Sequence, residues 1–172
     1  MTMHSKIVIS CGALIVAMVA GGGAAPSAAE PNAALQGVWR TLEVVVPGVP
    51  GAPSRTFKPE ATLTIFHDRH YSRVEVHAEQ PRPTLMDPTT ASADEIRAVW
   101  GPFVGEAGTF ELSGNDTITM QATVAKNPAA MKKGATSVYA YRREGDLLTL
   151  TQIRTHAGPS PNPITVKLTR VE

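Results

Sequence analysis

Cysteine is almost absent from this 172-residue chain, in which Cys11 is the only one. A single thiol excludes an internal disulfide and a zinc site built from several thiolates. Aromatic residues are scarce, at 5%, and neither sign of charge is in excess, because the formal net charge is +1. Without a basic stripe or a cationic amphipathic helix, nucleic acid and anionic membrane surfaces are poor candidate partners.

Long apolar runs are also missing, except near the start of the chain. Residues 7–20 are apolar apart from Ser10, Lys6 precedes them, and Ser27-Ala28-Ala29 forms a small-x-small motif before Glu30. This pattern predicts a secretory signal peptide over residues 1–29, with an uncleaved anchor as the alternative. We therefore expect one exported domain, residues 30–172, which is periplasmic or secreted and not inserted in a membrane.

The position of Cys11 argues against a lipoprotein cleavage site, because the main apolar run follows this residue instead of preceding it. The mature chain would then contain no cysteine, 15 basic residues and 15 acidic residues. Its stability must come from a hydrophobic core, and a domain of this size can bury one large enough.

Alternation of apolar and polar residues dominates the mature chain. Short alternating segments occupy residues 35–44, 61–66, 71–77, 108–112, 117–124, 137–142, 147–154 and 164–171. Turn sequences separate them, including His67-Asp68-Arg69-His70 and Glu144-Gly145-Asp146. About eight short strands joined by tight turns predict an all-β fold, an antiparallel barrel or sandwich.

One segment has helical spacing instead. Ser92 and Glu95 form a capping box, and Ile96, Val99 and Trp100 follow on one face. The pattern predicts one short amphipathic helix packed on an apolar surface, with Trp100 as its buried anchor.

Several short motifs together resemble the lipocalin-like domain family of small exported bacterial proteins. They are Gly37-x-Trp39, His70-Tyr71-Ser72, Trp100-Gly-Pro-Phe103, Ala107-Gly-Thr-Phe110, Ala125-Lys-Asn-Pro128, Thr151-Gln152 and Lys167-Leu-Thr-Arg170. The resemblance implies an up-and-down β-barrel with a ligand-sized interior and names no activity. It further implies that Trp39 closes one end of the barrel and that Arg170 stacks on it, while Gly37 permits a close crossing.

Alternation also predicts which side chains line the interior. Those expected inside are Trp39, Thr41, Glu43, Phe110, Leu112, Ile118, Met120, Leu148, Leu150, Val166 and Leu168. An inward Glu43 needs a partner, because an isolated buried carboxylate is costly. Arg154 could supply that partner.

The predicted ligand-binding residues are accordingly Glu43, Tyr139, Tyr141, Gln152 and Arg154. The alternative is that these groups only ring a solvated barrel mouth.

Other polar residues carry weaker signals. For the strand at residues 71–77, we expect Val74 and Val76 inside and Arg73 and Glu75 outside; the opposite phase would bring Tyr71 and Arg73 inward. The histidines of the 67–70 turn read as a surface turn and not as metal ligands. Lys126 reads as a solvated loop residue, with a place at the barrel mouth as the alternative.

Three functions fit this sequence. The first is binding of a small, partly apolar ligand with a polar or acidic end inside the barrel. The second is an isomerase or cyclase that uses Glu43 and Tyr141 as acid and base. The third is an envelope protein that binds a partner through its outer faces and the Trp100 helix. No catalytic serine elbow, phosphate loop or metal-ligand cluster is visible, so no cofactor or metal is predicted.

Overall fold

The computed structural model describes residues 31–49, 51–114 and 116–172. The predicted signal peptide, residues 1–29, lies outside these ranges. The strands are β1 (Gly37–Val46), β2 (Arg55–Phe57), β3 (Ala61–His67), β4 (His70–Val76), β5 (Phe103–Ser113), β6 (Thr117–Ala125), β7 (Ser137–Glu144), β8 (Leu147–Thr155), β9 (Gly158–Pro159) and β10 (Thr165–Arg170). The helices are α1 (Ala93–Trp100) and two 3₁₀ turns, η1 (Pro31–Ala34) and η2 (Pro128–Met131).

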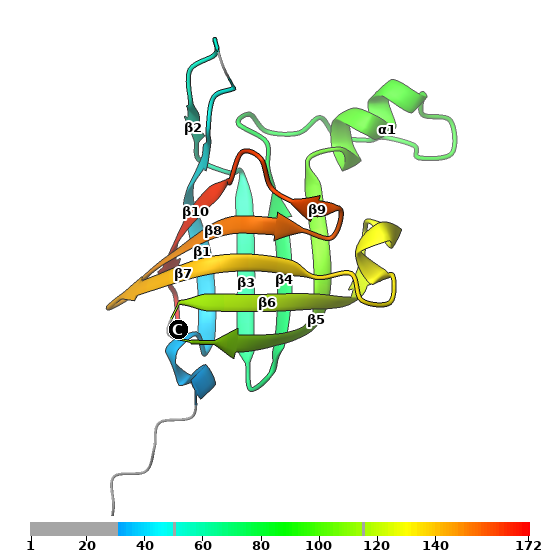
Figure 1. Cartoon of the computed structure of the whole chain (residues 1–172). Helices are drawn as coiled ribbons and strands as arrows, with labels where there is room; N and C mark the ends of the chain where they lie inside the picture. Colours follow the sequence, from blue (N-terminus) through cyan, green and yellow to red (C-terminus); the bar gives the residue numbers. More distant parts are fainter. Residues whose placement is uncertain (1–30, 50, 115) are drawn as a thin grey trace, which may run out of the picture.

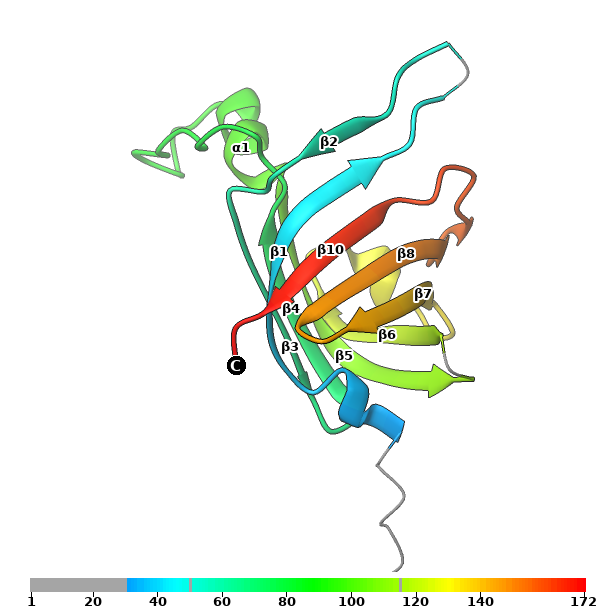
Figure 2. The same cartoon turned by 90° about the vertical axis from the view of Figure 1, so that its left-hand side faces the viewer.

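The strands form one antiparallel sheet that closes on itself (Figures 1 and 2). Neighbours follow the order β1-β3-β4-β5-β6-β7-β8, and β10 closes the ring by pairing with both β8 and β1. The predicted all-β fold, an antiparallel barrel with one short helix, is confirmed. The small strands β2 and β9 extend the pairing of β1 and β8 beyond the ring.

Trp39 lies near the start of β1, and this strand starts at the lower end of the barrel in Figure 1. Its side chain is fully buried, and its indole Nε1 donates a hydrogen bond to the carbonyl of Leu35, 2.8 Å away. The guanidinium of Arg170 lies 5.4 Å from the Trp39 ring, as predicted, and that of Arg143 lies 5.8 Å from it. Two cations therefore flank the indole, where one was expected.

Gly37 has the close approach that the sequence predicted. Its φ is +121°, and a Cβ there would lie 2.4 Å from the carbonyl oxygen of Glu172 and 2.6 Å from the Arg170 guanidinium. Only glycine fits a backbone of this conformation in this space. The C-terminal end of the chain can therefore cross the first strand at the closed end.

Outside the strand at residues 71–77, the buried core confirms all but one of the predicted inward residues. It is made by Leu35, Trp39, Phe66, Tyr71, Phe110, Ile118, Met120, Tyr139, Leu148, Leu150 and Leu168, with Leu112, Tyr141 and Val166 packed against it. Thr41 is buried as well, at 4% exposed. The exception is Glu43.

Glu43 faces outward, so its predicted inward position is wrong. The pairing of β1 with β10 shifts between Thr41 and Glu43, which inserts Leu42 as an extra residue. The shift reverses the alternation, so that Val44, 2% exposed, takes the next inward position. Glu43 instead forms an ion pair of 2.6 Å with Lys167.

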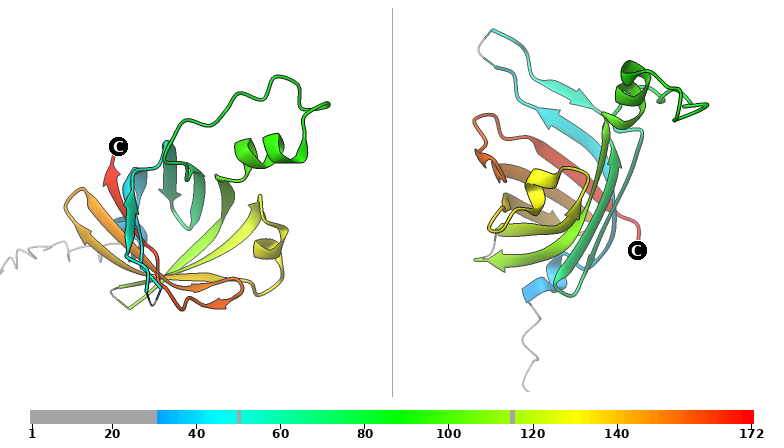
Figure 3. Two further views of the ribbon diagram at one scale, coloured as in Figure 1. Left: turned by 90° about the horizontal axis from the view of Figure 1, so that it is seen from above. Right: turned by 90° about the vertical axis from the view of Figure 1, so that its right-hand side faces the viewer.

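Helix α1 begins where the capping box predicts, with Ser92 accepting from the Glu95 amide and Glu95 accepting from Ser92. Its apolar side is not buried, however. Trp100 is 49% exposed, so its predicted role as a buried anchor is wrong. Helix α1 is inserted between β4 and β5 and lies to one side of the barrel, not across its opening (Figure 3).

Candidate functional site

Strand β4 presents a polar inner face to the barrel interior. Tyr71 and Glu75 are buried, at 4% and 2% exposed, whereas Val74 is 47% exposed. The expectation that Val74 faces inward and Glu75 outward is therefore wrong, and the alternative phase, with Tyr71 and Arg73 inward, is the observed one. Val76, which was also expected inside, is buried, at 5% exposed. Tyr71 pairs with Phe66 of β3, and this register puts the apolar Val74 beside Leu63 on the outer wall.

Arg73 lies at the centre of a polar network that it forms with Tyr71, Glu75, Glu106 and Tyr139. Its Nη2 donates to the Glu106 carboxylate at 2.8 Å, and its Nη1 donates to the Tyr139 hydroxyl at 3.4 Å. Its Nε lies 4.0 Å from Glu75 Oε2 and has no hydrogen-bond partner in the described part of the chain. Burial opposes the charge on Arg73, but Tyr139, Glu75 and Glu106 outweigh it and raise the arginine pKa.

Glu75 and His77 form a second pair on the same side of the interior. The carboxylate of Glu75, 3% exposed, lies 2.7 Å from His77 Nε2, and Thr64 donates to its other oxygen at 3.5 Å. Burial alone would raise the pKa of Glu75, but the hydrogen bond from His77 and the charge of Arg73 lower it. An ionised Glu75 can only accept a hydrogen bond, so the proton must lie on His77 Nε2.

Tyr71 shares the carboxylate of Glu106 with Arg73, donating its hydroxyl at 3.3 Å. Burial, and after it the nearby charge of Glu106, raises the pKa of the Tyr71 phenol. Tyr71 therefore stays protonated and acts as a hydrogen-bond donor inside the network.

Tyr139 faces this network from β7, on a different wall of the barrel. Its side chain is 3% exposed, and its hydroxyl oxygen lies 3.0 Å from the donating Nε2 of Gln152. With Arg73 as the second donor, both lone pairs of that oxygen are occupied. The phenolic proton has no acceptor among the described residues, so it is free for a bound molecule.

A cavity of about 110 Å³ lies beside these groups. Its lining residues are Arg73, Glu75, His77, Val104, Tyr139, Gln152, Ile164 and Val166. Val104 is the second residue of β5, Ile164 immediately precedes β10 and His77 follows β4, so the cavity lies toward the barrel end opposite Trp39. A few placed polar groups facing an apolar wall are typical of a small-molecule site.

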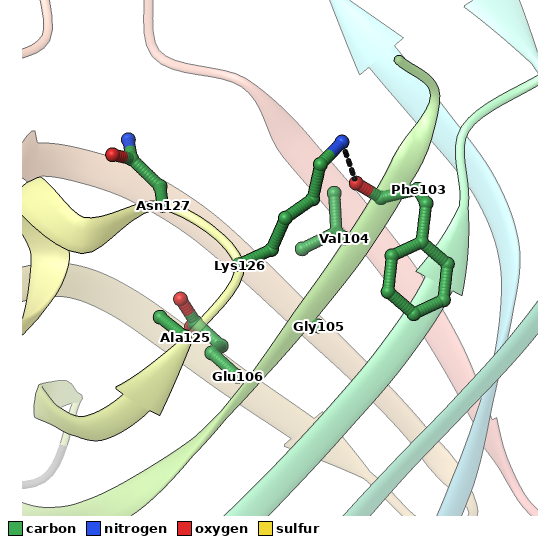
Figure 4. A pocket seen from close by; sticks show the side chains of 7 residues that line it. All are labelled: Phe103, Val104, Gly105, Glu106, Ala125, Lys126 and Asn127. Carbon is green, nitrogen blue, oxygen red and sulfur yellow. Dashed lines mark hydrogen bonds between the residues drawn. The ribbon is translucent and has the colours of Figure 1, made fainter. Parts of the chain in front are cut away.

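A second hollow, of about 200 Å³, lies at the rim between β5 and β6 (Figure 4). Lys126 crosses it, and its Nζ donates to the carbonyls of Trp100, Gly101 and Phe103. Lys126 is thus neither simply solvated nor directed into the barrel. It ties the end of α1 to β6, and its ammonium group is already used by those carbonyls.

The structure brings together only part of the predicted site. Tyr139 and Gln152 are bonded to each other and line the cavity. Tyr141 is directed inward but packs against the core beside Leu150, away from that lining. Arg154 is exposed, beyond a register shift between β7 and β8. Glu43 and Arg154 do not meet inside the barrel.

The sequence interpretation missed Glu75, His77 and Glu106 as site residues, and it gave Arg73 only as the alternative phase of its strand. For all but Glu106 a signal was present, because Arg73, Glu75 and His77 occupy alternate positions in the segment 71–77. The valines between them favoured the wrong face. In the described ranges, no three histidine, cysteine or acidic side chains gather to hold a metal ion, and no helix there is long and apolar enough to span a membrane.

Comparison with known proteins identifies no family. No family model and no curated protein matches the sequence. Among solved structures, the chain is similar to a redesigned β-barrel at 12% identity and a TM-score of 0.41, over 83% of this chain and 96% of that chain. It is also similar to an uncharacterized protein from Bacteroides eggerthii DSM 20697 at 10% identity and a TM-score of 0.39, over 78% and 98%. Scores this low support no argument about function.

Proposed function

We propose that this protein binds a small, partly apolar molecule in the barrel interior, with the polar end of the ligand against Tyr139. The observation that carries the proposal is the unused phenolic proton of Tyr139 at the wall of a 110 Å³ cavity. A free donor in a low-dielectric site favours a ligand that brings an acceptor. Val104, Ile164 and Val166 provide the surface for its hydrocarbon part.

The charges of the network favour a neutral polar end over an acidic one. Two carboxylates, Glu75 and Glu106, share one guanidinium, that of Arg73. Among the described residues that line the cavity, a further carboxylate would meet only this one guanidinium, which already faces both glutamates, and both glutamates would repel it. A carbonyl or hydroxyl group can accept from Tyr139 without that penalty.

The cavity also distinguishes binding from a purely structural role. An envelope protein that used only its outer faces would be expected to have a filled barrel, whereas here space remains beside five polar groups. Membership in the lipocalin-like family and export of the mature domain belong to the same proposal. Release of residues 1–29 in the native host would give a mature chain that starts at Glu30, which intact-mass measurement tests directly.

Ligand-observed NMR provides the test, with three probes that share one hydrocarbon ring. Cyclohexanone, cyclohexanecarboxylate and cyclohexylammonium present a neutral acceptor, an anion and a cation. We expect saturation transfer from the protein to cyclohexanone and a much weaker effect for cyclohexanecarboxylate. Cyclohexylammonium has no acceptor for the Tyr139 proton, so it should also bind more weakly than the ketone.

A pair of matched variants locates the binding. Val166→Phe fills the cavity from inside, and Val124→Phe adds the same ring to an outer position that is already 61% exposed. The first should abolish the cyclohexanone signal and the second should leave it intact. Equal signals in both variants, or preference for the carboxylate, would contradict the proposal.

A further inference from the structure

We infer that the cavity can catalyse proton transfer at the carbon next to a ligand carbonyl, with His77 as the base and Tyr139 as the donor to the carbonyl oxygen. This inference rests on the proposed binding of a neutral carbonyl compound and extends it to a reaction. Neither residue belongs to the acid–base pair expected from sequence, Glu43 and Tyr141, which the structure places on opposite sides of the barrel wall.

The arrangement of His77 suits a base. Glu75 holds its Nε2 at 2.7 Å, and this contact fixes both the ring orientation and the position of the proton. The other nitrogen, Nδ1, has no hydrogen-bond partner among the described residues and carries the lone pair of the neutral ring. His77 lines the cavity and retains 31% exposure of its side chain, so a bound molecule can reach it. A histidine oriented by a carboxylate is a common arrangement for general-base catalysis.

Tyr139 provides the complementary group from another wall. Strands β4 and β7 are separated in the sheet by β5 and β6, so the two residues approach the cavity from different directions. Hydrogen bonds from Arg73 and Gln152 to the Tyr139 oxygen point its own proton away from them. The same two donors would stabilise negative charge that develops on this oxygen as the proton leaves.

The reaction balances without a cofactor. His77 Nδ1 accepts a proton from the carbon beside the carbonyl, and the electron pair of that C–H bond forms a C=C bond. The carbonyl π pair moves to oxygen, which takes the proton of Tyr139, so that an enol, an imidazolium and a phenolate result. Return of the two protons regenerates both residues, and delivery to a different carbon of a conjugated system gives an isomer.

Hydrogen–deuterium exchange into cyclohexanone in D₂O measures this step directly, by loss of the α-proton signal in ¹H NMR. The full-length mature protein should accelerate exchange above the buffer rate. His77→Gln keeps a donor for Glu75 but has no base, and should bring exchange back to the buffer rate while cyclohexanone still binds. Tyr139→Phe should slow exchange by about 10²-fold, a typical contribution of a positioned acid.

His70→Gln is the matched control, because His70 is the exposed first residue of β4 and lies outside the cavity lining. It should exchange cyclohexanone at the wild-type rate. Binding without accelerated exchange, or equal rates in His77→Gln and wild type, would overturn the catalytic inference and leave the binding proposal intact. Absence of cyclohexanone binding to wild type would instead refute the proposed function, and the inference with it.

Discussion

The Oε2 atom of Glu75 lies 2.7 Å from Nε2 of His77, in a carboxylate group of which only 3% is exposed. A buried carboxylate is tolerated only when charged or hydrogen-bonding partners replace the water it has lost. His77, Arg73 and Thr64 are those partners. Glu75 thus connects Arg73, in the polar network inside the barrel, to His77 at the rim of the barrel.

Replacement of Glu75 by glutamine should change how stability depends on acid. The pKa of Glu75 is lowered in the folded state, so its contribution to stability is present above the unfolded pKa of about 4.3 and is lost as the pH falls through the folded value. Glu75→Gln should therefore lose about 1–3 kcal/mol at neutral pH and show a shallower decline in acid. Urea denaturation over this pH range measures both effects, and an unchanged acid slope would refute the assignment.

The Tyr71 phenol should ionise only at a pH well above the usual range for tyrosine. Because burial and Glu106 raise its pKa, the folded protein should resist loss of this proton. A raised pKa means that the corresponding stability is present below the unfolded pKa of about 10 and declines as the pH rises above it. Alkaline titration by phenolate absorbance tests this. Tyr71→Phe should remove a transition that lies above the ordinary tyrosine pKa of about 10, and loss of a transition near that ordinary value would contradict the hydrogen bond to Glu106.

The two tryptophans should differ sharply in their effect on stability. Trp39→Ala removes a fully buried indole and should cost about 3–5 kcal/mol of unfolding free energy. Trp100→Ala removes a ring that is 49% exposed, and should cost less than about 1 kcal/mol. Chemical denaturation of both variants provides the comparison. A small loss for Trp39→Ala would exclude its role in closing the barrel.

Ligand binding should distinguish residues that the sequence grouped together. Gln152→Ala removes a hydrogen bond that holds the Tyr139 hydroxyl in position for the ligand, and it should weaken cyclohexanone binding by about tenfold. Glu43→Gln should have no effect on binding, because Glu43 pairs with Lys167 outside the barrel. Its effect on stability should stay below about 1 kcal/mol, as for exposed ion pairs. Weaker binding by Glu43→Gln would restore the original prediction.

Lys126→Met should loosen α1 without affecting the barrel. The ammonium group supplies hydrogen bonds to the carbonyls at the end of the helix, and methionine retains the chain length without those donors. Hydrogen exchange followed by mass spectrometry should show faster exchange over residues 93–101 and unchanged protection in β3 and β4. Uniformly faster exchange would indicate that Lys126 stabilises the barrel itself.

The fold could be predicted from sequence because its signals are local. Alternation with a period of two fixes a strand wherever it occurs, and the Ser92–Glu95 capping box fixes the start of α1. The close crossing at Gly37 and the stacking of Arg170 on Trp39 were expected from the resemblance to lipocalin-like proteins, and both are present in the structure.

The predicted ligand-binding residues did not include Arg73, Glu75 and His77, which line the cavity. The reason is that alternation gives the period of a strand and not its absolute phase. An extra residue at Leu42 reverses the phase of β1, and only pairing with β10 reveals it. The register of β3 with β4 likewise directs Arg73 and Glu75 inward and leaves Val74 outside. The sequence by itself determined the strands, their turns and the closed end. Closure of the barrel decided which polar side chains meet inside, because a buried charge is stable only beside partners that distant strands supply.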